Sequence, residues 1–313
     1  MKNKKIIIKE TEAGSRADKF LVEVFKGYSR SFWQKAIADG LVLINGEKII
    51  PHYKIKAGDE VKIKERQVEK VVEEKKIDLS PDKKIKFVVI FENDDFLIID
   101  KPAGLAVHPS IGTPKGTLAN GLLARYPKIK GVGEDENRPG IVHRLDKEVS
   151  GLMAVAKNQK TFLRLKKQFQ KREVKKEYLA LVYGVINKDS GEIDLPVGRS
   201  KTTGIMATGG EGYKEAKTLF RVEKRFRNYS YLKINILTGR THQIRVHFKS
   251  IEHPVVGDRI YGLKQYNKFK DFGLSRVFLH SHKLGFKNTT GERVEFISAL
   301  PRELKDALES IKD

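Results

Sequence analysis

The 313-residue sequence contains no cysteine, which excludes disulfide bonds and thiolate metal sites. It also lacks any apolar run approaching the ~18–20 residues that a membrane-spanning helix requires. Near the N-terminus the longest apolar run is Ile6–Ile8, which is too short for a secretory signal. These absences predict a cytoplasmic protein without a membrane segment.

Acidic residues are scarce relative to basic ones, because 40 Asp and Glu stand against 62 Lys and Arg, a net charge of +22. Such an excess attracts polyanions, of which nucleic-acid backbones are the commonest. A lysine-rich solvated surface is the alternative that charge alone leaves open. With 39% hydrophobic residues, the chain can fold into one large and one small globular domain.

Residues 1–64 have the pattern of a small module of helices and a β-hairpin. Ser15 can cap a helix whose apolar face is formed by Ala17, Phe20, Leu21 and Val24. A second helix is predicted to begin at Ser29 or Ser31 and to end at Gly40. Asn45-Gly46 between two short apolar runs predicts a hairpin, and a last strand follows around residues 61–63.

The segments GSRADKF, SRSFWQKAIADGLVLING and KAGDEV, in this order, resemble the S4-like RNA-binding module of ribosomal proteins. The resemblance implies a group of helix-borne cations that approach RNA phosphates, namely Arg16, Lys19, Arg30 and Lys35. An ordinary solvated helix face would carry the same residues. Residues 65–84 are highly charged without an apolar face, which predicts a linker to a domain over residues 85–313.

The segment RPGIVHRLDKEVSGL, residues 138–152, contains the strongest candidate for a reaction centre. Its Pro-Gly turn and the run Ile141–His143 predict a short strand that leads into a tight loop. Asp146 in this loop is a carboxylate among cations, with Arg144 two residues before it. The alternative to a reaction centre is that Asp146 forms an ordinary ion pair on the surface.

This segment resembles the catalytic loop of the RluA-type pseudouridine synthases, which isomerise uridine in RNA. Further segments match that family in order: KPAGLAVHP, KKEYLALVYGVI, LTGRTHQIRVHF, HPVVGDRIYG and RVFLHSHKLGF. The family usually has Asp-Thr where this chain has Glu148 and Val149. The resemblance implies an α+β fold, in which a mixed, mainly antiparallel β-sheet catalytic domain follows the S4-like domain.

The resemblance also implies roles for five residues. Asp146 is the catalytic residue, and Arg245 pairs with it. Tyr178 stacks on a uridine that has been flipped out of the RNA, and Leu279 walls the base pocket. Arg144 is placed to fill the space that the flipped nucleotide leaves.

A helix is predicted over residues 158–171, with Phe162, Leu165 and Phe169 on one face and basic residues on another. Residues 157–177 contain nine basic and two acidic side chains, a stripe that could guide an RNA backbone. A solvated face is the alternative reading of this stripe.

No metal or other cofactor is expected. His242 and His247 are five residues apart, a spacing that does not place them on one helical face, and isomerisation transfers no electrons. An ionised aspartate can either attack C1′ as a nucleophile or remove a sugar proton, and both mechanisms stay open.

The predicted function is isomerisation of specific uridines in RNA, with ribosomal RNA or a pre-ribosomal particle as the partner of a monomeric enzyme. The alternative is a non-catalytic RNA-binding factor of ribosome assembly. That alternative explains the charge and the N-terminal module, but gives no reason for Asp146, Tyr178 and Arg245 to occur together.

Overall fold

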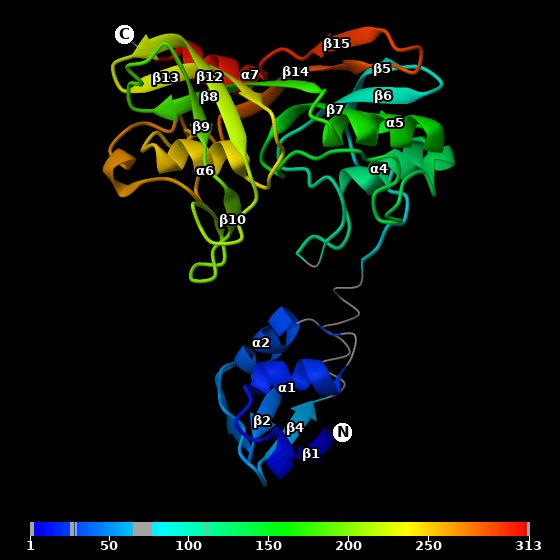
Figure 1. Ribbon diagram of the computed structural model, residues 1–313, viewed down its shortest axis with the longest axis vertical. Helices are drawn as coiled ribbons and strands as arrows, with labels where there is room; N and C mark the ends of the chain where they lie inside the picture. Colours follow the sequence, from blue (N-terminus) through cyan, green and yellow to red (C-terminus); the bar gives the residue numbers. More distant parts are fainter. Residues whose placement is uncertain (1–2, 26–27, 29, 65–76, 111, 312–313) are drawn as a thin grey trace. The chain divides into compact units, whose positions relative to one another are not determined.

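The computed structural model of the chain describes residues 3–25, 28, 30–64, 77–110 and 112–311 (Figure 1). The chain divides into two compact units, Met1–Ile77 and Asp78–Asp313, which we describe separately. Residues 65–76, most of the predicted linker, lie outside the described residues. Among the described residues, no helix combines the length and the apolar character needed to cross a membrane.

The first unit packs two helices on one antiparallel sheet of order β1-β4-β2-β3. Its elements are β1 (Asn3–Ile7), the 3-10 helix η1 (Glu10–Glu12), α1 (Ala17–Val24), α2 (Arg30–Ala38), β2 (Val42–Ile44), β3 (Glu47–Lys48) and β4 (Glu60–Lys64). The core between helices and sheet includes Phe20, Trp33 and Val61. The two predicted helices and the hairpin are confirmed, whereas the pattern did not predict β1.

The predicted cap of the first helix is wrong. Arg16, not Ser15, holds the N-cap position of α1, and no side chain caps the helix there. The Ser15 hydroxyl donates to the Glu12 carbonyl of the preceding 3-10 helix instead. The hairpin turn agrees with the prediction, since Asn45 and Gly46 both have positive φ, 52° and 85°.

The second unit is built on a nine-stranded sheet of order β5-β6-β7-β14-β8-β13-β12-β9, with β15 paired to β14. The strands are β5 (Val88–Glu92), β6 (Phe96–Lys101), β7 (Ser150–Ala156), β8 (Lys175–Tyr183), β9 (Ser190–Asp194), β12 (Lys217–Phe226), β13 (Tyr229–Ile236), β14 (Leu279–Lys287) and β15 (Arg293–Ile297). A separate ribbon pairs β10 (Val197–Arg199) with β11 (Met206–Thr208). Only β7 and β14 run parallel among the described pairs, which confirms a mixed, mainly antiparallel sheet.

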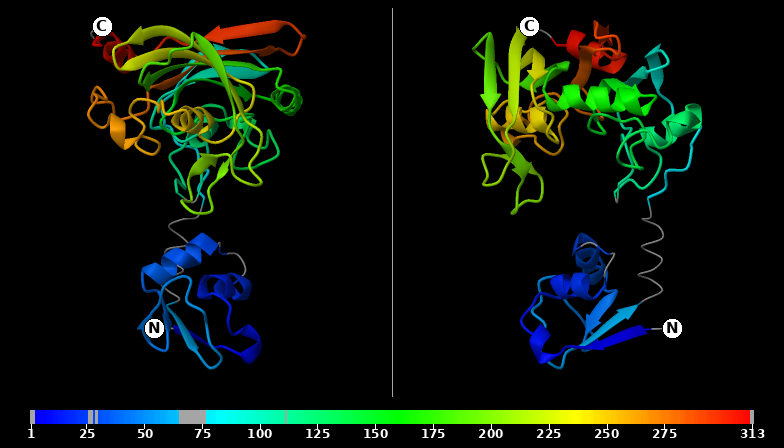
Figure 2. Two further views of the ribbon diagram at one scale, coloured as in Figure 1. Left: turned by 60° about the vertical axis from the view of Figure 1, so that its left-hand side comes forward. Right: turned by 45° about the vertical axis from the view of Figure 1, so that its right-hand side comes forward.

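Helices cover both faces of this sheet. One face packs against α4 (Leu118–Arg125) and α6 (Gln243–Ser250), and the strands arch over α6, coloured yellow in Figure 2. The other face packs against α5 (Gln159–Gln170) and α7 (Arg302–Glu309). Along β8 the side chains therefore alternate between two cores, with Tyr178 and Ala180 in one and Leu181 in the other. The two remaining 3-10 helices are η2 (Pro127–Ile129) and η3 (Lys264–Tyr266).

β14 joins the two halves of the sheet, because it lies between β7 and β8. The parallel contact to β7 is unusually close at Gly151, which has φ 114°. A Cβ atom at this position would lie 2.3 Å from the carbonyl oxygen of Ser281 on β14. A glycine is therefore required where the strand that follows the Asp146 loop meets the centre of the sheet.

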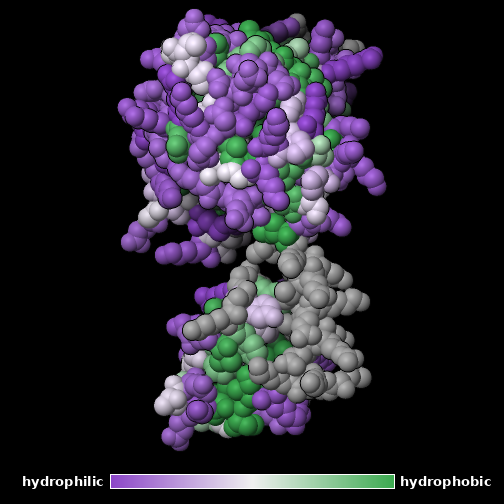
Figure 3. All heavy atoms as spheres, turned by 90° about the vertical axis from the view of Figure 1, so that its right-hand side faces the viewer, coloured by the Kyte–Doolittle hydropathy of each residue, from purple (hydrophilic) through white to green (hydrophobic). Residues whose placement is uncertain are grey.

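Two sequence-based boundaries differ from the structure. Residues 141–143 form no strand, since Ile141 makes only an isolated bridge to Val155. The second unit begins at Asp78 rather than at residue 85, because the Asn120 side chain donates to the carbonyls of Asp78 and Ser80 at 2.9 and 2.8 Å. On the side of the second unit that faces the viewer in Figure 3, the surface is largely hydrophilic, with scattered apolar patches.

Candidate active site

Asp146 lies in a loop that immediately precedes β7, and a buried lysine anchors this loop. The fully buried ammonium of Lys101, at the end of β6, donates to three backbone carbonyls, those of Pro102, Leu105 and Lys147. The last of these bonds fixes the residue next to Asp146. The loop therefore presents its carboxylate from a rigid support at the edge of the core.

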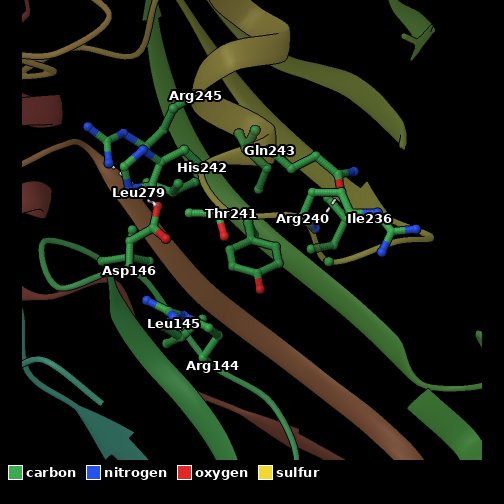
Figure 4. A pocket seen from close by; sticks show the side chains of 14 residues that line it. Arg144, Leu145, Asp146, Ile236, Arg240, Thr241, His242, Gln243, Arg245 and Leu279 are labelled. Atoms are coloured by element: carbon green, nitrogen blue, oxygen red, sulfur yellow. Dashed lines mark hydrogen bonds and ion pairs between the residues drawn. The ribbon is translucent and has the colours of Figure 1, made fainter. Parts of the chain in front are cut away.

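The predicted pair of Asp146 and Arg245 is present. Arg245 Nη1 lies 3.5 Å from Asp146 Oδ2, and His242 Nε2 lies 3.9 Å from the same oxygen. Figure 4 shows the carboxylate directed toward these two side chains from the opposite side of the pocket. The Asp146 side chain keeps 15% of its surface exposed while Arg245 keeps 3%, so the carboxylate remains accessible from the pocket.

The stronger partner of Arg245 is Asp258. Its carboxylate accepts from Arg245 Nε at 2.6 Å and from Nη2 at 2.8 Å, a bidentate pair with a completely buried acid. Burial acts to lower the pKa of Arg245, but the hydrogen bond and charge of Asp258 outweigh burial and raise it. Asp258 also accepts from the backbone N–H groups of Ile260 and Tyr261. The guanidinium is thus fixed by Asp258, and Asp146 keeps only one longer contact to it.

The turn before α6 places His242 beside Asp146. By residue type Thr241 is the expected N-cap of α6, but the structure places His242 there, in a left-handed conformation with φ 56°. The Gln243 side-chain oxygen instead accepts from the Arg240 N–H at 3.0 Å and from the Thr238 hydroxyl at 2.7 Å. Burial lowers the pKa of His242 despite the nearby Asp146 charge, which favours the neutral imidazole.

Tyr178 and Leu279 come from adjacent strands, β8 and β14, and line the same pocket as Asp146. Both side chains are largely buried, with 6% and 3% of their surface exposed. Burial, reinforced by the Asp146 charge, raises the pKa of Tyr178 far above its usual value. Its hydroxyl is therefore protonated at neutral pH.

Among the described side chains that line this pocket, Asp146 is the one acidic residue, and the cations are Arg144, Arg240 and Arg245. Arg144 is exposed, and its Nη1 lies 3.4 Å from Nε2 of His108. The pocket thus combines one carboxylate, an aromatic ring, an aliphatic wall and a cationic rim. All five residues that the resemblance placed in a site are brought together in it.

No group of three or more His, Cys, Asp or Glu within the described parts of the chain is arranged to hold a metal ion. His247 is turned away from the pocket, with Nδ1 bonded to Thr218 at 2.9 Å and Nε2 bonded to the Leu195 carbonyl at 2.9 Å. His242 and His247 therefore do not form a ligand pair.

In the first unit, a buried carboxylate organises two of the four predicted RNA-contacting cations. Arg16 and Arg30 each place Nε 3.0 Å from the Asp18 carboxylate, and Gln34 donates to it at 2.6 Å. Burial acts to raise the pKa of Asp18, but these hydrogen bonds outweigh burial and lower it from 3.8 to about 2. The two guanidinium groups remain about half exposed. Lys19 and Lys35 are exposed on the same two helices.

The sequence pattern missed Lys101 and Asp258, which hold the two sides of the site. Asp258 lies in the segment HPVVGDRIYG, directly after the buried residues Val255 and Val256 and a glycine with φ 75°. An acidic residue directly after a run of buried residues is expected to be buried too, and its charge then needs a buried partner. The sequence did not indicate that this partner is Arg245, 13 residues earlier.

Comparison with known proteins gives two family matches. An RNA pseudouridylate synthase family model matches residues 95–250, and an S4 domain model matches residues 15–61. The chain is 42% identical over 298 residues to an uncharacterized RNA pseudouridine synthase of Aquifex aeolicus, covering 93% of this chain and 92% of the relative. It is 35% identical to the ribosomal large subunit pseudouridine synthase D of Vibrio parahaemolyticus, over 97% of this chain and 93% of that protein. The structure of human RNA pseudouridylate synthase domain containing 1 is also similar, with a TM-score of 0.57 and 28% identity over 75% of this chain and 99% of that chain.

Proposed function

The chain belongs to the RluA-type RNA pseudouridine synthases with an N-terminal S4 domain, and we propose that it modifies specific uridines of large-subunit ribosomal RNA. The enzyme is an isomerase that binds RNA. The proposed substrate is supported by relatives such as the Vibrio parahaemolyticus protein, whose name assigns it to the large ribosomal subunit. The observation that carries the proposed chemistry is the accessible Asp146 carboxylate beside a guanidinium that another acid holds in place.

Isomerisation breaks the N1–C1′ bond, turns the uracil and forms a bond between C5 and C1′. The C5 proton leaves, and N1 gains a proton, so atoms balance without a redox step. Asp146 assists either by adding to C1′ or by removing a sugar proton. In both cases the detached uracil has to stay in the pocket, between Tyr178 and the Leu279 wall.

The remaining pocket residues fit the same proposal. The target nucleotide has to leave the RNA stack to reach Asp146, which lies in a pocket. Arg144 on the exposed rim can occupy the space that the nucleotide leaves behind. The ring of Tyr178 offers a sequence-tolerant face for stacking, and its protonated hydroxyl can take part in moving the C5 proton.

The direct test is tritium release from ribosomal RNA that contains 5-tritiated uridine, followed by mapping of pseudouridine in a strain that lacks the protein. We expect label release by the wild-type enzyme and the loss of particular pseudouridines from large-subunit RNA in the deletion strain. An unchanged set of ribosomal pseudouridines would contradict the proposed substrate.

Tyr178→Ala should reduce kcat/KM more than Tyr178→Phe does, because stacking requires the ring. Base–aromatic stacking is worth about 1–3 kcal/mol, which corresponds to a roughly 5- to 150-fold loss. Thermal unfolding of both variants provides the control, since Tyr178 is also part of the core. Wild-type turnover in both variants would show that Tyr178 has only a structural role.

Removal of residues 1–77 should weaken RNA binding and flatten its salt dependence. Contacts that cations such as Arg16 and Arg30 make to phosphates release counterions, and each lost contact reduces the slope of log K against log[salt] by about 0.7–0.9. The cut falls at the observed boundary between the two units. A truncated protein with the wild-type slope would show that this unit does not anchor RNA.

A further inference from the structure

A cation-lined groove continues from the active-site pocket along β8, and we name it the β8 groove. It shares Arg144, Tyr178 and Arg240 with the pocket, and it is extended by Lys166, Arg172 and Lys176. No Asp or Glu is among the described residues that line it. Five cations without an acid among these described lining residues suit the binding of an anionic chain.

Lys176 differs from the other cations of the groove in being buried without an acidic partner. Only 9% of the residue is exposed, and its ammonium reaches the Thr238 carbonyl at 3.3 Å and lies 5.9 Å from the Phe169 ring centroid. By contrast, Lys166 pairs with Glu134 and Arg172 pairs with Glu215. No described acidic side chain lies within ion-pair distance of Lys176.

Burying a charge without a partner costs free energy, and this cost favours the neutral form of the Lys176 amine. Burial, followed by the charge of Arg172, lowers the pKa of Lys176 to about 8. At neutral pH the side chain is still mostly protonated. It is therefore a cation whose hydrogen-bonding capacity the protein leaves largely unused, next to the proposed binding site of a polyanion.

Lys176 and Tyr178 are two residues apart on β8, so their side chains leave the strand on the same face, about 7 Å apart. Both line the β8 groove, and Tyr178 also lines the pocket. A uridine stacked on Tyr178 would thus bring a flanking phosphodiester within reach of the ammonium.

We propose that Lys176 binds a backbone phosphate adjacent to the target uridine, so that one strand holds both the base and its phosphate. This inference rests on the proposed stacking of the target base on Tyr178. A lysine suits the task because its compact ammonium offers three donors to phosphate oxygens. The contact to Thr238 occupies only one of these donors in the free enzyme.

The test compares Lys176→Met with Lys175→Met on the same ribosomal RNA. Lys175 is the neighbour on β8 whose side chain is exposed and pairs with Glu295, so its replacement removes the same charge from outside the groove. We expect Lys176→Met to raise KM about tenfold with kcat little changed, and to reduce the salt slope of binding by about 0.7–0.9. Lys175→Met should leave both quantities near wild type.

Thermal unfolding separates phosphate binding from a structural role. Removing an unpaired buried charge should leave the unfolding midpoint of Lys176→Met unchanged or raised. A lowered midpoint together with an unchanged KM and salt slope would overturn the proposal, because Lys176 would then serve only to hold Thr238. If the Met variant does not fold, Lys176→Gln gives the same comparison, since its amide can still donate. Pseudouridine formation by the wild-type enzyme on this RNA tests the proposed function separately from the two variants.

Discussion

Replacement of Asp146 by asparagine should abolish isomerisation while folding and RNA binding stay close to wild type. Asparagine keeps the shape of the side chain but can act neither as a nucleophile nor as a base. Loss of a base alone costs about 10²–10⁴-fold in rate, and the described residues that line the pocket include no second acid to replace it. The fold should tolerate the change because Arg245 keeps its bidentate contact with Asp258.

Tritium release under single-turnover conditions measures this effect, and filter binding measures retention of the RNA. Glu148→Gln is the matched control, because it makes the same chemical change two residues away in the same loop and outside the pocket lining. We expect that control to be nearly as active as wild type. Residual activity above a few per cent in Asp146→Asn would overturn the assignment of Asp146.

Replacement of Arg245 by methionine should reduce both turnover and stability, and the stability loss should come from Asp258. Removing one member of a buried pair leaves an uncompensated charge, which costs about 3–5 kcal/mol. Asp258 is completely buried, whereas Asp146 is open to the pocket. Most of the lost stability should therefore come from the unpaired Asp258 carboxylate. Turnover should fall because Asp146 loses the guanidinium beside it.

A double variant separates these two effects. In Arg245→Met with Asp258→Asn neither position keeps a charge that needs the other, so the free energy of unfolding should recover while turnover stays low. Arg245→Lys should restore only part of either quantity, since one ammonium cannot reproduce the bidentate contact. Recovery of turnover in the double variant would show that Arg245 acts on the fold alone.

The sequence indicated residues that line the candidate pocket, but not the residues that support them. Asp146, Tyr178, Arg245 and Leu279 were placed together by resemblance, although they are distant in the chain, and the structure brings them into one pocket. Asp258 was missed because a buried ion pair depends on the tertiary approach of two segments. Periodicity within either segment contains no information about that approach.

Two local errors have a physical explanation as well. Residues 141–143 resemble a strand because they follow a turn and are largely apolar, but the His143 imidazole accepts from the Ala154 N–H at 2.9 Å. A side chain thus satisfies a backbone group of β7 that a neighbouring strand would otherwise pair. Similarly, Thr241 has the right residue type for a cap, yet it is the Gln243 side-chain oxygen that accepts the hydrogen bond from the Arg240 N–H in this turn. In both places a side chain replaces the backbone or capping partner that local patterns assume.

The position of β14 has a consequence for biosynthesis. Ribosomes make β7 and β8 well before residues 279–287, although β14 separates those strands in the finished sheet. Until that segment emerges, both strands expose unpaired edges, which favour association with other chains. The nascent polypeptide also lacks Leu279, which lines the pocket, so we expect no RNA modification before synthesis has passed Lys287.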